Sequence, residues 1–193
     1  MARPREFDPR EALDKAMLQF WAAGYHDTSI RDLTARTGVN QYGLYSQFES
    51  KRGLYLAALD RYRDTVTRAV LARLRQAGPV ADALSGAFAV LIARMRTEDG
   101  AVGCMMANAA LEVAPQDEGA AAKVDAHMTL LREAIGARLD AARTAGDLAS
   151  ETDTGQLAEF FATTAYSLGF LLRAGRDDAY LQRHITTALA VLG

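Results

Sequence analysis

The chain has 193 residues, of which 50% are hydrophobic and 24% are charged, and its formal net charge at pH 7 is −2. This composition is typical of a soluble protein with a sizeable core, and the presence of only four prolines favours helices over strands. The single cysteine, Cys104, excludes an intramolecular disulfide and a zinc site made from several cysteines.

Targeting signals and charge distribution narrow the class of protein further. The apolar runs are too short or too interrupted to span a bilayer, and residues 1–8 show no secretory signal, so we expect a cytoplasmic protein without a membrane partner. Residues 1–52 carry eight Lys or Arg against seven Asp or Glu, whereas the remainder carries 14 against 17. The small basic excess at the N-terminus is compatible with a local DNA-binding face but does not by itself predict one.

The N-terminal segment predicts a helix from about residue 9 to residue 23. Asp8 can accept hydrogen bonds from the first turn, Pro9 suits the first helical position, and Gly24 is a typical helix end. Arg3 and Arg5, ahead of this helix, form either a solvated tail or an arm for the minor groove of DNA. Apolar residues at helical spacing give the helix one buried face: Leu13, Ala16, Met17, Phe20 and Trp21.

Two short helices joined by a glycine turn are expected next. The first starts at Thr28 or Ser29 and ends at Gly38, and the second is capped by Asn40 and ends at Phe48. This is the pattern of a helix-turn-helix, whose second helix lies in the major groove of DNA. We expect the second helix to contact DNA through Asn40, Gln41, Tyr42, Gly43, Tyr45, Ser46 and Gln47.

The rest of the chain is also expected to be helical. A long helix from Ser50 towards Gly78 would connect an N-terminal head, residues 1–52, with a C-terminal body, residues 53–193. Five further helices are expected at about 80–97, 103–113, 118–145, 153–174 and 177–192. No segment alternates with the period of a strand over a useful length. The predicted fold class is therefore all-α, with about nine helices in a three-helix head and a helical-bundle body.

Residues 9–62 combine several sequence features at fixed spacing. These features are Gly24-Tyr25, Thr28-Ser29-Ile30, Gly38-Val39, Leu44-Tyr45 followed by Phe48, and Lys51. The arrangement resembles the N-terminal domain of the tetracycline-repressor (TetR) family. The resemblance implies a repressor that binds a palindromic operator as a homodimer and that a small-molecule or thiol-reactive effector releases from DNA. Gln41 departs from the lysine frequent at its position, so the resemblance does not carry over an operator sequence.

Four residues of the head are expected to contact DNA phosphates. Thr28 and Ser29 are either plain helix caps or phosphate ligands at a helix N-terminus. Lys51 stands at a helix start, where a cation is electrostatically unfavourable, and a nearby phosphate would explain it. In similar proteins the hydroxyl of the residue matching Tyr45 touches phosphate, and the alternative is that Tyr45 is simply half-buried.

The most distinctive stretch of the body runs from Gly103 through Cys104 and Asn108 to Glu112. It is similar to a Gly-Cys-x-x-x-Asn-x-x-x-Glu segment of one branch of TetR-like regulators, in some of which the cysteine senses electrophiles or oxidants. A helix N-terminus would favour the thiolate of Cys104. A buried, inert cysteine is the alternative interpretation.

Methionine and aromatic side chains could line an adaptable effector pocket between body helices, although the same residues also fit an ordinary core. The three histidines, His26, His127 and His184, lie far apart without ligand spacing, so no metal or cofactor is expected. His127 is expected at the surface, and the alternative is that His127 and Asp125 touch a polar effector. The candidate pocket residues are Met95, Cys104, Met105, Asn108, Met128, Tyr166 and Phe170.

The last two predicted helices carry broad apolar faces, which either bury in a monomer core or pair with a second copy. In TetR-like proteins the corresponding helices form a four-helix bundle with those of the partner. The resemblance thus implies a homodimer with contacts from Phe161, Leu168, Leu172, Ile185 and Leu189. No Ser-His-Asp set, carboxylate pair or glycine-rich phosphate loop points to an enzyme. A helical adaptor without DNA binding remains the alternative, because the head is weakly charged.

Overall fold

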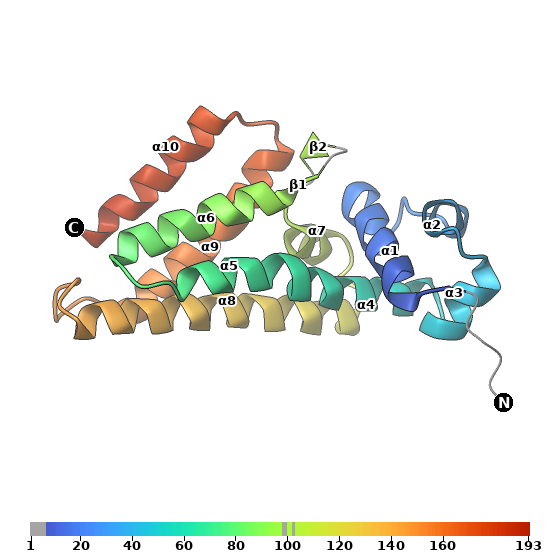
Figure 1. The fold of residues 1–193 in the computed structure, drawn as a ribbon, viewed down its shortest axis with the longest axis horizontal. Coiled ribbons are helices and arrows are strands. Elements are labelled where there is room, and N and C mark those ends of the chain that lie inside the picture. The colour runs from blue at the N-terminus through green and yellow to red at the C-terminus, as the bar shows by residue number, and fades with distance from the viewer. Residues whose placement is uncertain (1–6, 98–99, 102) are drawn as a thin grey trace. The chain divides into compact units, whose positions relative to one another are not determined.

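The computed structural model describes residues 7–97, 100–101 and 103–193, so Arg3 and Arg5 lie outside the described residues. The all-α fold class is confirmed (Figure 1). A pair of two-residue strands, β1 (Arg96–Thr97) and β2 (Gly100–Ala101), is antiparallel and too short to produce a visible alternation in the sequence. The helices are α1 (Pro9–Ala23), α2 (Ile30–Thr37), α3 (Gln41–Phe48), α4 (Lys51–Tyr62), α5 (Arg68–Leu74), α6 (Val80–Met95), α7 (Met105–Glu112), α8 (Glu118–Thr144), α9 (Thr154–Arg173) and α10 (Asp178–Leu189).

The expected long fourth helix is divided. A π-helical turn, Arg63–Thr67, joins α4 to α5, and its hydrogen bonds reach one residue farther along the chain than those of an α-helix. Because the division creates one more element, the described residues form ten α-helices where the sequence predicts about nine. No proline or glycine marks residues 63–67, so periodicity alone did not distinguish this turn from a continuous helix.

The chain forms two compact units. The first runs up to Asp64 and includes Asn108–Val124, and the second comprises Thr65–Ala107 and Asp125–Gly193. The predicted boundary at residue 52 is therefore wrong. Ion pairs hold the start of α8 in the first unit: Arg52 binds Asp117 at 2.5 Å, and Lys123 binds Asp60 at 2.5 Å.

The first unit is organised around α1 and α4, which pack along each other. The Asp8 carboxylate accepts the N–H of Arg10 at 2.8 Å and begins α1 as the sequence predicts. At the other end, Gly24 has a φ of 88°, a conformation that favours glycine. Between them, the ring of Trp21 meets Tyr62 of α4 edge-on, with the ring centroids 4.9 Å apart.

The second unit is built on α6, which packs against α5, α9 and α10. In its core the rings of Phe88 and Phe161 lie 6.3 Å apart, and both side chains are buried. The N-terminus of α6 is fixed by Asp147, whose carboxylate accepts the N–H of Val80 at 2.7 Å. These contacts join α5, α6, α9 and α10 in the second unit, whereas α7 and α8, which the sequence also places in the body, are divided between the two units.

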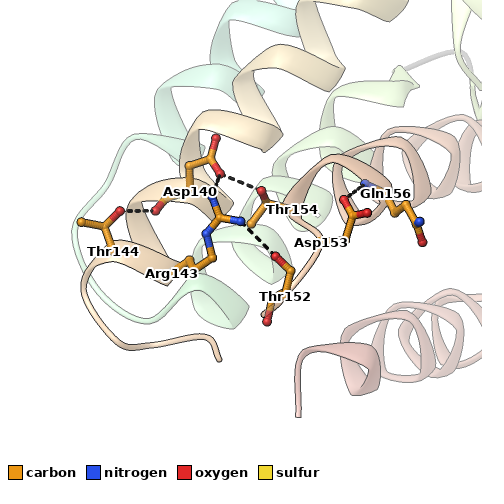
Figure 2. Close-up of polar contacts among 7 residues, drawn as sticks. All are labelled: Asp140, Arg143, Thr144, Thr152, Asp153, Thr154 and Gln156. Atoms are coloured by element: carbon orange, nitrogen blue, oxygen red, sulfur yellow. Dashed lines mark hydrogen bonds and ion pairs between the residues drawn. The ribbon is translucent and has the colours of Figure 1, made fainter. Parts of the chain in front are cut away.

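The connection between α8 and α9 is closed by a small polar cluster (Figure 2). Asp140 of α8 accepts hydrogen bonds from the Thr154 hydroxyl at 2.6 Å and from Arg143 at 3.0 Å. The same Arg143 donates to the carbonyl of Thr152 at 3.0 Å, while Asp153 caps α9. The cluster ties the end of α8 to the start of α9.

Candidate DNA-binding site

Helices α2 and α3 form the predicted helix-turn-helix (Figure 1). Gly38 ends α2 in the left-handed conformation, with φ 75° and ψ 9°, and its N–H donates to the carbonyl of Thr34 at 3.0 Å. Val39 and Leu44 are buried behind the turn, together with Leu33 of α2. The turn thus fixes α3 on a small apolar core and leaves its other face exposed.

The exposed face of α3 is polar. Gln41, Tyr42, Ser46 and Gln47 are exposed, and Tyr42 is the most open, with 85% of its surface accessible. Asn40 caps the helix by accepting the N–H of Gly43 at 2.8 Å. Amide and hydroxyl groups of this kind can bond to base edges and phosphates.

Gly43 has a packing role in this helix. A Cβ atom at this position would lie 2.8 Å from Cγ1 of Val39 and 3.3 Å from the ring of Phe7. Since real Cβ atoms do not approach as closely as 2.8 Å, a side chain at residue 43 would force Val39 to shift, and the Phe7 ring would have to move by a few tenths of an ångström. Because glycine has no side chain, the predicted contact between Gly43 and DNA can involve only its backbone atoms, and it stays a prediction.

Ser29 begins α2 through a reciprocal cap. Its hydroxyl donates to Oδ2 of Asp32 at 2.6 Å, and its N–H donates to the same atom at 2.8 Å. These bonds, the side-chain bond first, hold the pKa of Asp32 below its ordinary value. The exposed Ser29 is positioned for phosphate, but its hydroxyl and N–H already serve this carboxylate, so a phosphate contact stays a prediction.

The prediction that the Thr28 side chain contacts DNA is wrong. Thr28 is fully buried, and its hydroxyl donates to the carbonyl of Gly24 at 2.6 Å. A cap residue and the residue before it look alike in sequence, because Ser and Thr both suit either position. In the structure Ser29 caps α2, whereas the Thr28 hydroxyl closes the turn between α1 and α2.

Lys51 and Tyr45 both lie near Tyr25 of the head. The Nζ atom of Lys51 lies 4.4 Å from the ring centroid of Tyr25, a cation–π contact that holds the side chain in place. Tyr45 is half-buried. Burial, followed by the charge of Asp117, raises the pKa of Tyr25 above its ordinary value, so Tyr25 stays neutral. The phosphate contacts of Lys51 and Tyr45 stay predictions.

One residue that holds the turn before α2 was not predicted from the sequence. Oε1 of Glu112, the last residue of α7, accepts the N–H of His26 at 2.7 Å in the turn between α1 and α2. The signal that could have found it was present, because Glu112 ends the distinctive segment that begins at Gly103. Its partner, 86 positions earlier in the chain, could not be read from spacing.

A pocket of about 340 Å³ lies between α8 and α9 in the second unit. It contains two of the seven predicted effector residues, Met128 and Tyr166, together with the charged side chains Asp125, Arg132 and Glu159. None of these three charged residues has an ion pair among the residues that the structure describes. The pocket is therefore more polar than the apolar site expected.

The other predicted pocket residues lie elsewhere. Met95, Cys104 and Met105 are buried in the core, each 3% exposed or less, and do not line this pocket. Asn108 belongs to the first unit, and Phe170 is 67% exposed on the surface of α9. Methionines and aromatic residues at helical spacing describe a core as well as a pocket, and three of the seven predicted pocket residues belong to the core.

His127 is buried, contrary to the expected surface position. It is 3% exposed, and Nδ1 of its ring lies 2.6 Å from the Tyr166 hydroxyl, while Nε2 lies 2.9 Å from the Thr67 hydroxyl. Burial raises the pKa of Tyr166 well above its ordinary range. Both ring nitrogens are thus paired, so His127 serves a hydrogen-bond network that reaches from the pocket to the π-helical turn.

Comparison with known proteins decides the family. A model of the tetracyclin repressor-like C-terminal domain matches residues 80–188, and a model described as bacterial regulatory proteins, tetR family, matches residues 12–58. The chain belongs to the TetR family. It is 32% identical to the HTH-type transcriptional regulator YezE of Bacillus subtilis over the full length of both chains. It is also 32% identical to the HTH-type transcriptional repressor ComR of Escherichia coli, over 97% of this chain and 90% of that protein.

A solved structure extends the similarity to a DNA complex. The TetR family regulator CifR, as a cysteine mutant bound to a 26-bp double-strand operator DNA, is 28% identical to this chain. The two superpose with a TM-score of 0.90 over the full length of both chains. These relatives are transcriptional regulators and not enzymes. This TetR-family member is thus a transcriptional regulator of the helix-turn-helix type.

The predicted dimer contacts of this TetR-family chain need correction. Phe161, Leu168, Leu172 and Ile185 are at most 2% exposed in the single chain, so their side chains have no surface to offer a second copy. Leu189 is half-buried. Helical spacing identified apolar positions on α9 and α10, but α9 carries apolar residues on two faces. The outward ones include Phe160, 42% exposed, and Phe170.

None of the described helices is long and apolar enough to cross a membrane. Among those same residues, no three His, Cys, Asp or Glu side chains gather into a group that could hold a metal ion.

Proposed function

We propose that this TetR-family regulator represses transcription by binding a palindromic operator as a homodimer in the cytoplasm, and that a small molecule bound in the second unit releases it. The exposed polar face of α3, set by the Gly38 turn, carries the proposal. A helix held in this way places its N-terminal residues in the major groove. Gln41, Tyr42 and Gln47 are the side chains proposed to read bases.

The operator of CifR supports a dimeric arrangement. It is a 26-bp duplex, and half-sites of a twofold operator lie about 10 bp or a multiple of it apart, so two heads fit on such a length. Phe160 and Phe170 on α9 and Tyr180 on α10 supply exposed aromatic surface for a second copy. Aromatic residues of this kind are enriched in protein interfaces.

The effector site is proposed at the pocket between α8 and α9. Its charged rim of Asp125, Arg132 and Glu159 and its Tyr166 wall suit a small polar molecule that carries both hydrogen-bond donors and acceptors. A thiol-reactive effector is not favoured, because Cys104 is 3% exposed. DNA and effector would disfavour each other reciprocally, with a coupling of about 1–3 kcal/mol.

Titration of the full chain onto DNA from its own upstream region, followed by fluorescence anisotropy at two salt concentrations, tests the proposal. Tight, salt-weakened binding that exceeds binding to a scrambled duplex is expected. Tyr42→Ala and Gln47→Ala should remove the preference over the scrambled duplex, while Glu133→Ala in the second unit should not. Equal affinity for both duplexes would favour a helical adaptor and overturn the assignment of α3.

A further inference from the structure

The turn between α1 and α2 is held from outside its own sequence. Gly24 has a φ of 88°, and His26 donates its N–H to Oε1 of Glu112 at 2.7 Å. A Cβ atom on Gly24 would lie 2.8 Å from Oε2 of the same carboxylate. The Glu112 side chain thus fits closely against a turn whose backbone requires glycine.

The anchored turn leads directly into the DNA-binding helices. Thr28, two residues after His26, is fully buried and bonds back to Gly24 at 2.6 Å. Ser29 then starts α2. Because Gly24, His26 and Thr28 are each held by a hydrogen bond, the position of the carboxylate sets where α2 begins. Helix α3 then follows α2 through the Gly38 turn.

The charge of Glu112 opposes DNA binding. A carboxylate in the DNA-binding unit repels phosphate, and it also lies close enough to Tyr55 to help burial raise the pKa of that phenol. A residue present only for its charge would therefore weaken the complex. A residue that positions the turn would strengthen it, so the two roles predict opposite signs.

We propose that Glu112 is a positioning residue for operator binding: its carboxylate holds the turn between α1 and α2 so that α2 and α3 face DNA together. The proposal rests on the proposed DNA-binding function and gives a role to the final residue of the Gly-Cys segment. It acts through the His26 N–H and not by touching DNA.

The residues just before α7 are also closely packed. A Cβ on Gly103 would lie 2.6 Å from the carbonyl oxygen of Gly169, and a Cβ on Gly169 would lie 2.6 Å from Cβ of Cys104. This approach to α9 lies within the second unit and does not involve Glu112, which belongs to the first unit.

Two variants with the same charge separate positioning from electrostatics. Glu112→Gln removes the charge but keeps an oxygen that accepts from His26, whereas Glu112→Ala removes both. Operator affinity of the full-length protein is measured by anisotropy on its upstream DNA, with Glu133→Ala as an exposed control outside the first unit. Glu112→Ala is expected to weaken operator binding up to about tenfold relative to Glu112→Gln, the scale of one hydrogen bond between neutral groups.

Hydrogen exchange distinguishes local loosening of the turn between α1 and α2 from unfolding of the whole chain. Hydrogen exchange of the His26 amide should become faster in Glu112→Ala than in Glu112→Gln, while amides of α9 keep their protection. Equal operator affinity of the two variants, or tighter binding by both than by the wild type to the same degree, would overturn the positioning role. If the wild type itself prefers no duplex, the proposed function fails instead, and the two failures are thereby distinguished.

Discussion

The hydroxyl of Tyr166 lies 2.6 Å from Nδ1 of His127. Tyr166 forms part of the pocket between α8 and α9, and the opposite nitrogen of His127 lies 2.9 Å from the hydroxyl of Thr67, the last residue of the π-helical turn. One buried imidazole therefore joins the pocket to the π-helical turn between α4 and α5. Because π-helical turns are frequent at functional sites, we expect the network of Tyr166, His127 and Thr67 to matter for the stability of this region.

Tyr166→Phe removes one hydrogen bond and leaves a buried ring nitrogen of His127 without that partner. We expect the free energy of unfolding to fall by about 1–3 kcal/mol, the cost of an unsatisfied buried polar group. Urea denaturation at neutral pH measures it. Tyr180→Phe is the matched control, since Tyr180 is 41% exposed and should change stability by less than about 0.5 kcal/mol. Equal effects of the two substitutions would contradict the network.

Asp32→Asn tests the cap of α2 through its pH dependence. The pKa of Asp32 is lowered from 3.8, mainly by the Ser29 hydroxyl, so its stabilising contribution is present above the unfolded-state pKa and is lost as pH falls through the folded-state pKa. The variant should be less stable than the wild type at pH 7, and the difference should shrink towards about pH 3. Urea denaturation at both pH values measures this, and a constant difference would rule out the cap as its cause.

The same substitution should act on DNA in the opposite direction. Removing a negative charge at the N-terminus of α2 reduces repulsion of phosphate, so operator affinity should rise although stability falls. Asp27→Asn changes the same charge in the preceding turn without touching the cap. It should raise affinity in the same sense and leave stability unchanged, as judged by anisotropy and urea denaturation.

The caps show what the sequence could predict. Asp8, Ser29 and Asn40 each bond to an N–H two or three residues ahead, so the signal and the structure it produces lie within one short window. The Gly38 turn was readable for the same reason, because a left-handed residue after a short helix favours glycine. These local rules located the helix-turn-helix and its exposed face.

Contacts between residues far apart in the chain could not be predicted from the sequence. The Glu112–His26 bond joins residues 86 positions apart, and the Arg52–Asp117 pair joins residues 65 apart. Periodicity also failed on α9, where it identified Phe161 as apolar but not as inward-facing, while the neighbouring Phe160 is 42% exposed. Both failures have one physical cause, since burial depends on the partner element and not on the helix alone.

Alanine substitutions at two helical glycines should change the free energy of unfolding in opposite directions. At Gly136 in α8 a Cβ would lie 3.5 Å from Cβ of Ala158, an ordinary contact, so Gly136→Ala should raise the free energy of unfolding by about 0.5–1 kcal/mol. At Gly53 in α4 a Cβ would lie 2.1 Å from the carbonyl oxygen of Phe48, which forces the backbone to move. Gly53→Ala should therefore destabilise by about 1–3 kcal/mol. Thermal and urea unfolding compare them, and stabilisation by both would refute the close approach at Gly53.

Phe170→Ala tests whether the outward face of α9 joins two copies. Phe170 is 67% exposed, so its loss should cost the single chain little stability. In a twofold dimer the side chain is buried twice, and removing it should cost about 3 kcal/mol per dimer or more. That loss corresponds to a rise of about 100-fold in the dimer dissociation constant.

Sedimentation velocity over a dilution series measures the shift, with Leu111→Ala as the control, because Leu111 is 82% exposed on α7 and belongs to the first unit. Operator affinity should fall in parallel for Phe170→Ala, since one head alone contacts only one half-site. If Phe170→Ala stays dimeric at every concentration at which the wild type does, the second copy must contact another face, and the exposed aromatic residues of α9 lose their proposed role.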